Sequence, residues 1–141
     1  MPRETVHVLL IDDNDVDVEG VRRAFRKHRF AAPLIVARDG HEGLELLREG
    51  RVPRPHVVLL DLNMPGMGGL EFLARLRADP ATRDTVVFVQ TTSKRDEDVV
   101  ASHRQNVAGY FVKSELGVGL AKLVELLRAY LRVVTLPVGG A

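Results

Sequence analysis

Short apolar segments alternate with amphipathic segments along most of the chain. Five runs have the length and composition of buried β-strands: Val6 to Ile11, Leu34 to Ala37, His56 to Leu60, Thr85 to Gln90 and Gly109 to Val112. The segments between them carry apolar residues every three or four positions, which is the spacing of an amphipathic helix. Alternation of strand and helix is typical of a parallel sheet covered on both faces. The pattern therefore predicts one α/β domain with five strands and five helices.

Apolar stripes locate the predicted helices. The clearest are Val18, Val21 and Phe25 in the first helix, Leu70, Leu73 and Leu76 in the third, and Leu116, Leu120, Leu123, Leu127 and Leu131 in the last. The second helix is predicted to begin near Gly40 and to end near Glu49, because the prolines of the following segment cannot continue a helix.

The segment from Ser93 to Asn106 differs from the other predicted helices. It is mostly charged or polar, and its apolar anchors are Val99, Val100 and Ala101. A helix with few buried contacts is displaced at a low cost in free energy, so this element is a candidate for one that moves. A static, solvent-facing helix is an equally weighted interpretation.

Charged and hydroxyl side chains stand where the predicted strands end. Asp12 and Asp13 follow the first strand, and Asp61 follows the third. Thr91 follows the fourth strand and Lys113 follows the fifth. The functional crevice of an open parallel sheet lies at the carboxyl ends of its strands. We therefore expect these five side chains to meet at one edge.

This set of residues fits phosphoryl chemistry with a hard cation. Asp12, Asp13 and Asp61 would form an oxygen-only cluster of the kind that holds Mg²⁺. With the charge neutralised, one carboxylate can stay ionised and attack phosphorus to give an aspartyl phosphate. Lys113 would then pair with a phosphoryl oxygen, and the Thr91 hydroxyl would donate to another.

Each of these residues also has a purely structural interpretation. Asp13 or Asn14 is suited to capping the first helix, and Asp61 precedes a Met-Pro-Gly turn. Lys113 is then a surface lysine and Thr91 a β-branched strand residue. These interpretations would all have to hold together, and none explains why three apolar runs each end on a charge. The functional interpretation is therefore preferred.

Composition narrows the class of protein. The 141 residues suit one domain, and 20 Lys and Arg against 19 Asp and Glu give a formal net charge of +1. That balance argues against a nucleic-acid partner. There is no cysteine, and the five histidines form no pair at metal-ligand spacing on one helix, so thiolate and zinc sites are not expected. Neither a signal peptide nor a segment of membrane-spanning length is evident, which predicts a soluble cytoplasmic protein without a membrane partner.

The ordered set of acids, hydroxyl and lysine resembles the receiver domain of bacterial two-component response regulators, from about Val6 to Arg132. The resemblance implies a flavodoxin-like fold, a doubly wound five-stranded parallel sheet of order 2-1-3-4-5 with helices on both faces. It assigns the acidic pair to Asp12 and Asp13, the phosphoacceptor to Asp61, the conformational-switch hydroxyl to Thr91, the switch aromatic to Tyr110 and the phosphoryl-contacting lysine to Lys113.

The same resemblance implies a Mg²⁺ cofactor. Its ligands would be Asp13, Asp61 and the backbone carbonyl of Asn63, with Asp12 acting partly through water. Asn63 and Ser93 occupy positions that flank the acyl phosphate in the family and tune its lifetime.

Two positions depart from the family pattern. Ser114 stands where receivers commonly carry Pro, which argues against the cis peptide usual there because non-proline cis bonds are costly. Thr92 stands where the family usually has a very small residue, so access to the phosphoryl pocket is expected to differ.

Two functions of different classes follow. The favoured one is a single-domain response regulator, not a turnover enzyme, that accepts a phosphoryl group from a histidine kinase and alters its surface at the fourth helix, fifth strand and fifth helix. Similarity to regulators paired with bacterial phytochrome kinases comes from the motif residues 12–14 with Asp17, residues 91–93, and Leu136-Pro137.

The alternative is an aspartyl-phosphate hydrolase of small phosphate esters. It is disfavoured because Asn63 provides no general acid and no cap insertion is present. A pseudo-receiver that only binds is disfavoured because the acids, hydroxyl and lysine are all present.

The end of the chain is unusually apolar. We divide the chain into a receiver domain, residues 1–132, and an arm, residues 133–141, which carries Val133, Val134, Leu136 and Val138. Pro137 cannot continue a helix. The arm packs on its own domain, is disordered, or reaches a partner subunit. Resemblance to the phytochrome-associated receivers favours a homodimer through the last helix and the arm.

Overall fold

Five parallel strands lie side by side in one sheet of order β2-β1-β3-β4-β5. The computed structural model describes residues 5–137. The strands are β1 (His7–Ile11), β2 (Leu34–Ala37), β3 (His56–Leu60), β4 (Val86–Thr91) and β5 (Gly109–Val112). The predicted flavodoxin-like topology and strand order are confirmed. Thr91 is the last residue of β4 rather than the residue after it.

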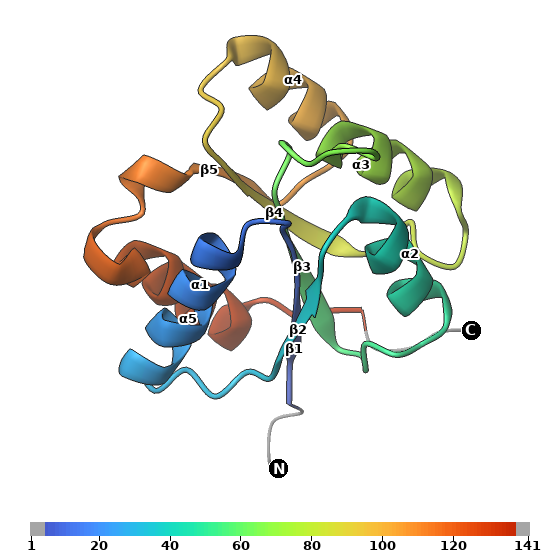
Figure 1. The fold of residues 1–141 in the computed structure, drawn as a ribbon. Coiled ribbons are helices and arrows are strands. Elements are labelled where there is room, and N and C mark those ends of the chain that lie inside the picture. The colour runs from blue at the N-terminus through green and yellow to red at the C-terminus, as the bar shows by residue number, and fades with distance from the viewer. Residues whose placement is uncertain (1–4, 138–141) are drawn as a thin grey trace.

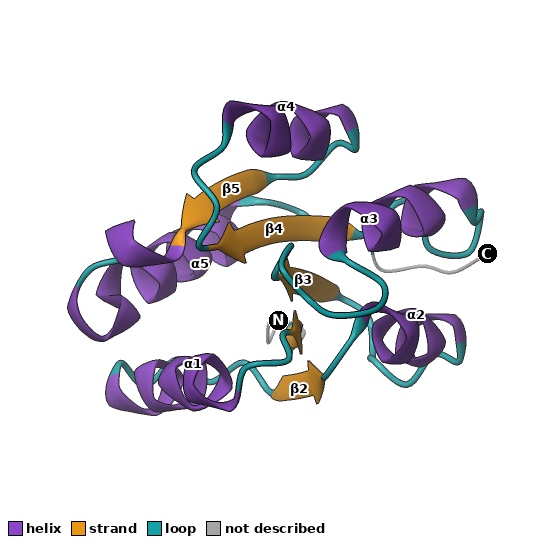
Figure 2. Ribbon diagram, turned by 45° about the horizontal axis from the view of Figure 1, so that its top comes forward, coloured by secondary structure: helices purple, strands orange, loops and turns teal. Residues whose placement is uncertain are grey.

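Helices cover both faces of the sheet (Figures 1 and 2). They are α1 (Asp15–Lys27), α2 (Gly40–Arg48), α3 (Gly69–Ala78), α4 (Asp96–Arg104) and α5 (Ala121–Val133). Helices α1 and α5 lie on one face and α2 and α3 on the other, while α4 lies beside α3 and β5. In residues 5–137 no helix has the length and apolar character needed to span a membrane.

Burial on both faces explains the continuous apolar runs of the strands. On β1, Leu9 and Ile11 pack in the core beneath α2 and α3, while Val8 and Leu10 pack in the core beneath α1 and α5. All five residues of β3 are buried. A strand enclosed in this way has no solvent-facing side, so its sequence shows no polar alternation.

Side-chain caps set where α1 and α2 begin. The Asn14 side chain accepts a hydrogen bond from the Asp17 backbone N–H at 3.0 Å, and Asp39 accepts one from Glu42 N–H at 2.9 Å. Such caps satisfy N–H groups that have no partner within the helix. Of the two residues considered as caps for α1, Asn14 fills the role, and Asp13 is not used for it.

Helix α4 is anchored weakly, as its sequence indicates. The helix is described in full, and Ser102 is its one buried residue. Val100 is 48% exposed. Few buried contacts lower the free energy of local displacement. That α4 moves therefore remains a prediction, now with structural support for its weak attachment.

The last helix begins later than predicted. Leu116 and Leu120 precede α5, which starts at Ala121. The backbone has positive φ at Gly117, Gly119 and Leu120, with values of 81°, 59° and 58°. A right-handed helix cannot pass through such residues, and glycine adopts positive φ at little cost. Leu116 is buried nonetheless, so the apolar spacing identified a core residue but not a helical one.

The first residues of the predicted arm are part of their own domain. Helix α5 continues through Val133, which is 80% exposed, and Leu136 is 7% exposed within the core beneath α1 and α5. Val138 lies outside the described residues. Intramolecular packing therefore holds for Leu136, and dimerisation stays a prediction.

Gly69 permits the close approach of α3 to the segment after β3. A Cβ atom on Gly69 would lie 2.6 Å from Leu62 Cα and 2.8 Å from the Asp61 carbonyl oxygen. Both neighbours are backbone atoms, which cannot rotate away as a side chain can. Glycine at this position therefore helps to fix the loop that follows Asp61.

We predict opposite effects for two glycine-to-alanine substitutions. Gly69→Ala should lower the free energy of unfolding by about 1–3 kcal/mol through overpacking. Gly20→Ala is the matched control, because its Cβ would meet Leu120 Cδ1 at an ordinary 3.9 Å. It should raise the free energy of unfolding by about 0.5–1 kcal/mol through helix propensity. Urea unfolding measures both, and equal stability of the two variants would contradict the packing argument.

Candidate functional site

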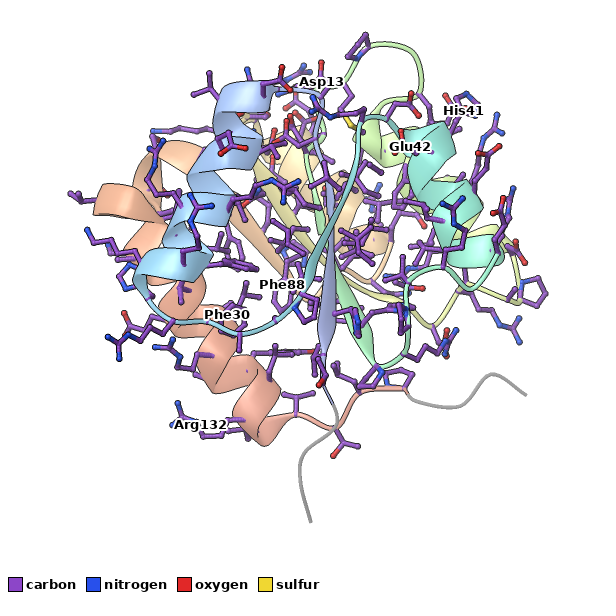
Figure 3. The ribbon with its side chains drawn as sticks, turned by 60° about the horizontal axis from the view of Figure 1, so that its bottom comes forward. Asp13, Phe30, His41, Glu42, Phe88 and Arg132 are labelled. Atoms are coloured by element: carbon purple, nitrogen blue, oxygen red, sulfur yellow. The ribbon has the colours of Figure 1, made fainter. Side chains whose placement is uncertain are left out.

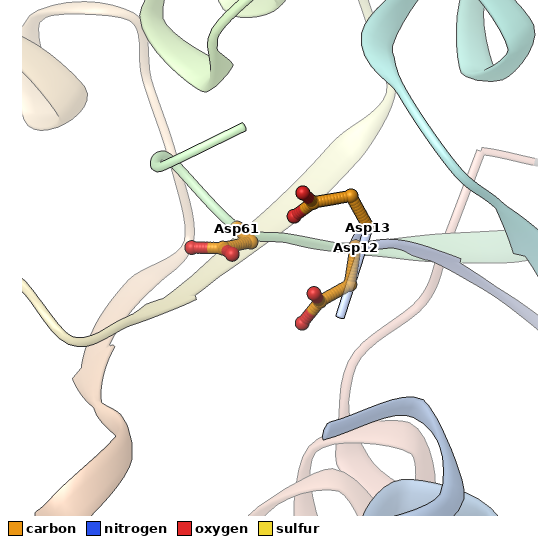
Figure 4. A group of neighbouring side chains, drawn as sticks. All are labelled: Asp12, Asp13 and Asp61. Atoms are coloured by element: carbon orange, nitrogen blue, oxygen red, sulfur yellow. The ribbon is translucent and has the colours of Figure 1, made fainter. Parts of the chain in front are cut away.

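Three carboxylates converge at the carboxyl edge of the sheet. Asp12 and Asp13 extend from the end of β1, and Asp61 extends from the end of the neighbouring β3 (Figure 4). One oxygen from each lies within 4.8 Å of the others. Asp12 is fully buried and Asp61 is 5% exposed, whereas Asp13 is exposed. The predicted acidic cluster therefore forms.

The sheet holds the backbones of these acids rigidly. The Asp12 N–H donates to the Ala37 carbonyl at 3.0 Å, and the Asp61 N–H donates to the Ile11 carbonyl at 3.0 Å. Ile11 and Leu60 are register partners, so the residues that follow them leave the sheet at the same level. In Figure 3, Asp13 lies at the end of the molecule where α1 and α2 begin, and Arg132 lies toward the opposite end.

Burial shapes the electrostatics of Asp12. Loss of solvent raises the pKa of its carboxyl above the ordinary value, and hydrogen bonds from the Asn14 N–H and from Lys113 offset part of that rise. The Asn14 N–H donates to Asp12 Oδ1 at 2.9 Å. A buried acid beside Asp61 therefore needs nearby positive charge to remain ionised.

Lys113 supplies positive charge from the end of β5. Its Nζ lies 3.0 Å from Asp12 Oδ2, 2.6 Å from Asp17 Oδ2 and 3.5 Å from Asp61 Oδ2. Burial of the amine would lower its pKa, but hydrogen bonds to Asp17 and Asp12 outweigh that effect, and the pKa of Lys113 is raised. In residues 5–137 the cis peptide bond is Arg54–Pro55, so the bond after Lys113 is trans.

The acidic cluster fits a small divalent cation. Mg²⁺ binds oxygen at about 2.1 Å, so two ligands on opposite sides of the ion are about 4.2 Å apart. The three carboxylate oxygens lie within 4.8 Å of one another, which is close to that span. The ligand set is all oxygen, as a hard cation requires. Asp12, Asp13 and Asp61 could therefore hold the ion with small side-chain adjustments.

Asn63 connects the phosphoacceptor candidate to the end of β4. Its backbone N–H donates to Asp61 Oδ1 at 3.1 Å. Its side-chain amide donates to Thr91 Oγ1 at 3.2 Å and to Thr92 Oγ1 at 3.3 Å. Thr91 is fully buried, and Thr92 is exposed. Asn63 is thus bonded both to Thr91, the predicted switch hydroxyl, and to Thr92, the residue expected to alter access to the phosphoryl pocket.

A hydrogen bond between Tyr110 and Ser93, the two remaining predicted site residues, connects β5 to the loop before α4. The Tyr110 hydroxyl donates to the Ser93 carbonyl oxygen at 3.0 Å. The Ser93 hydroxyl donates to the Asp98 carboxylate on α4. Loss of solvent raises the pKa of Tyr110, so this phenol stays protonated as a donor at neutral pH. Ser93 is therefore bonded to α4 in this structure.

Asp17 makes the shortest contact of Lys113 with an acid. The sequence pattern includes Asp17 as part of a motif but indicates no chemical role for it. Because Asp17 lies three residues after the Asn14 cap, the sequence places it in the first turn of α1. Nothing in the sequence indicates that this turn lies against the end of β5.

Taken together, the site has a buried carboxylate beside an ammonium group and beside a cluster suited to a cation. Asp61 provides a nucleophilic oxygen, and Lys113 provides a charge that can neutralise a developing oxyanion. Thr91 adds a hydroxyl at the neighbouring strand end. This combination is suited to covalent phosphoryl chemistry.

Comparison with known proteins agrees with this geometry. Residues 8–128 match the response regulator receiver domain. The chain is 34% identical over 135 residues to the response regulator Rcp1 of Synechocystis sp., covering 92% of each protein.

Two solved structures are similar along nearly their whole length. One is the Mn²⁺-bound form of Rcp1, with a TM-score of 0.80, 34% identity, and coverage of 95% of this chain and 99% of that one. The other is the phosphorylated cyanobacterial phytochrome response regulator RcpA, with a TM-score of 0.84, 29% identity and the same coverage. Sequence, fold and site agree, and the chain belongs to the family of response regulator receiver domains of two-component systems.

Proposed function

We propose that this chain accepts a phosphoryl group from a histidine kinase onto Asp61 and signals through the resulting change in its surface. The observation that carries the proposal is the placement of Asp61 at 5% exposure, 3.5 Å from the Lys113 amine and within the acidic cluster. A purely structural role would not require buried like charges to be gathered at one edge.

The transfer step follows from this geometry. An oxygen of Asp61 attacks phosphorus of a phosphohistidine, the P–N bond breaks, and its electron pair goes to the imidazole nitrogen, which takes up a proton. Lys113 neutralises a phosphoryl oxygen of the acyl phosphate that forms. Asp12, Asp13, Asp61 and the Asn63 carbonyl would hold Mg²⁺, which when bound supplies further charge neutralisation.

Hydrogen bonds at the edge of the sheet provide a path for the switch. The Thr91 hydroxyl accepts a hydrogen bond from the Asn63 amide, and its own proton would donate to a phosphoryl oxygen once the hydroxyl turns toward Asp61. Tyr110 and Ser93 join the same edge to α4, and α4 is weakly anchored. The altered surface would therefore comprise α4, β5 and α5, and Asn63 and Ser93 would tune the lifetime of the acyl phosphate.

The chain would catalyse only its own phosphorylation and dephosphorylation. A hydrolase of small esters would use a general acid near the nucleophile, but Asn63 stands two residues after Asp61 and its amide is bonded to Thr91 and Thr92. The kinase partner would be a bacterial phytochrome, because the cyanobacterial phytochrome response regulator RcpA is similar to this chain over nearly its whole length.

A homodimer through α5 and the segment after it is part of the proposal. Leu126 and Val134 are each 39% exposed and Val133 is 80% exposed, so apolar groups gather along the end of α5. Burial of such side chains against a second copy would remove apolar area from water.

We predict that Asp61→Asn abolishes phosphorylation. With Mg²⁺ and phosphoramidate, intact-mass measurement of the wild-type chain should show one added phosphoryl group. Asn keeps the shape of the side chain but lacks the nucleophilic carboxylate, so the adduct should disappear while folding persists. Asp96→Asn, an exposed acid on α4, serves as the control and should be modified normally. An unchanged adduct in Asp61→Asn would show that the phosphoacceptor is another residue.

We predict that Mg²⁺ raises the melting temperature. A cation that binds the folded state alone stabilises it by about 2.7 kcal/mol at a concentration 100 times its dissociation constant. Asp13→Ala should reduce this shift, because it removes an exposed ligand that is not bonded to Lys113. Glu45→Ala removes an exposed acid from α2 and should leave the shift intact. Equal shifts in the two variants would place the cation elsewhere.

We predict that the full chain is dimeric at tens of micromolar concentration and that a chain ending at Arg132 is less so, because the truncation removes the exposed apolar side chains of Val133 and Val134. Light scattering measures both states. A monomeric full chain, or a truncation as dimeric as the full chain, would contradict the role proposed for the end of the chain.

A further inference from the structure

Asp17 lies closer to the amine of Lys113 than Asp12 or Asp61 of the predicted metal cluster does. Its carboxylate accepts a hydrogen bond from Lys113 Nζ at 2.6 Å, compared with 3.0 Å for Asp12 and 3.5 Å for Asp61. Asp17 belongs to the first turn of α1, so this contact joins α1 to the end of β5.

The contact draws the amine away from the phosphoacceptor. Lys113 Nζ forms hydrogen bonds to Asp12 and Asp17, whereas its 3.5 Å approach to Asp61 is an ion pair without a hydrogen bond. A phosphoryl group on Asp61 would attract the same amine. Asp17 and that group would therefore compete for Lys113.

The charge of the site strengthens this competition. Asp12, Asp13, Asp17 and Asp61 carry four negative charges against one positive charge on Lys113 when all are ionised. An incoming phosphoryl group adds more negative charge, and like charges at this range repel. Asp17 adds to that repulsion without contributing to the carboxylate cluster.

Asp17 has room to release the lysine. Its side chain is 36% exposed, and both residues line a cavity of about 180 Å³ beside α1. The cap of α1 uses the backbone N–H of Asp17, not its carboxylate. The carboxylate can therefore leave Lys113 without loss of the cap.

We propose that Asp17 is a positioning residue that holds Lys113 in the unphosphorylated chain and releases it when a phosphoryl group binds at Asp61. This inference rests on the proposed function. Phosphorylation then frees a carboxylate on the first turn of α1, so the signal reaches α1 as well as α4, β5 and α5.

The test compares two substitutions in the same helical turn. Asp17→Asn removes the charge that holds Lys113, and Asp15→Asn removes an equal charge from a residue that is paired with Arg38 and 77% exposed. The probe is beryllofluoride with Mg²⁺, an anionic mimic of a phosphoryl group, and calorimetry measures its affinity. Asp17→Asn should tighten binding by about five-fold, and Asp15→Asn should change it by less than about two-fold. Phosphorylation by phosphoramidate should be faster in Asp17→Asn.

Two further measurements isolate the lysine. In a Lys113→Met background, Asp17→Asn should change affinity no more than Asp15→Asn does, because the pair no longer exists and only a general charge effect remains. Asp17→Glu keeps the charge and should restore affinity toward the wild-type value. In the wild-type chain, the side-chain carboxyl ¹³C signal of Asp17 should shift on addition of beryllofluoride, while that of Asp15 should not.

The outcomes separate this inference from the proposed function. Equal effects of Asp17→Asn and Asp15→Asn, weaker binding in Asp17→Asn, or an unmoved Asp17 signal would overturn the role of Asp17 while leaving the phosphoacceptor intact. An effect of undiminished size in the Lys113→Met background would also overturn it, because the whole effect would be one of general charge. A wild-type chain that binds no beryllofluoride and accepts no phosphoryl group would overturn both proposals.

Discussion

Repulsion among buried carboxylates is the constraint on which the edge of this sheet depends. Asp12 is fully buried and Asp61 nearly so, and a carboxylate that loses solvent is stabilised as an ion only by positive charge or by hydrogen-bond donors. Lys113 and the backbone N–H groups of Asn14 and Asn63 supply these contacts. The excess of negative charge that remains is consistent with the binding of a divalent cation.

The rest of the fold serves to hold that arrangement in place. Parallel strands buried on both faces leave their carboxyl ends at one level, and the register of Ile11 with Leu60 sets the acids beside each other. Close packing of Gly69 on Leu62 fixes the loop after Asp61. A rigid sheet with functional groups in the loops at its edge combines precise placement with freedom to respond.

Contacts that leave the site run in two directions. One direction leads to α4, the helix with the fewest buried residues of the five. It follows a hydrogen bond from Asn63 to Thr91 on β4, then the neighbouring strand β5, and then a hydrogen bond from Tyr110 to Ser93 in the loop before α4. Asp17 connects Lys113 to α1, which is anchored by Val18, Val21, Ala24 and Phe25. A displacement of α4 thus costs less free energy than one of α1, where a change would be limited to side chains.

Features that depend on local pattern could be predicted from the amino-acid sequence. The bounds predicted for β2, β3 and β5 agree with the structure, because these strands are short apolar runs with clear ends. The convergence of Asp12, Asp13, Asp61 and Lys113 followed from one rule of parallel sheets. The family was indicated by resemblance, through the order of these residues together with Thr91 and Tyr110.

Contacts that depend on how one helix or strand packs against another were evident only in the tertiary structure. Apolar spacing could not show that Leu116 precedes α5, because a buried leucine contributes the same signal in a turn as in a helix. Burial of Leu136 and the contact of Asp17 with Lys113 join residues that are far apart in the chain. The partner of a side chain in such a contact is set by how helices pack on the sheet, and local pattern carries no information on that packing.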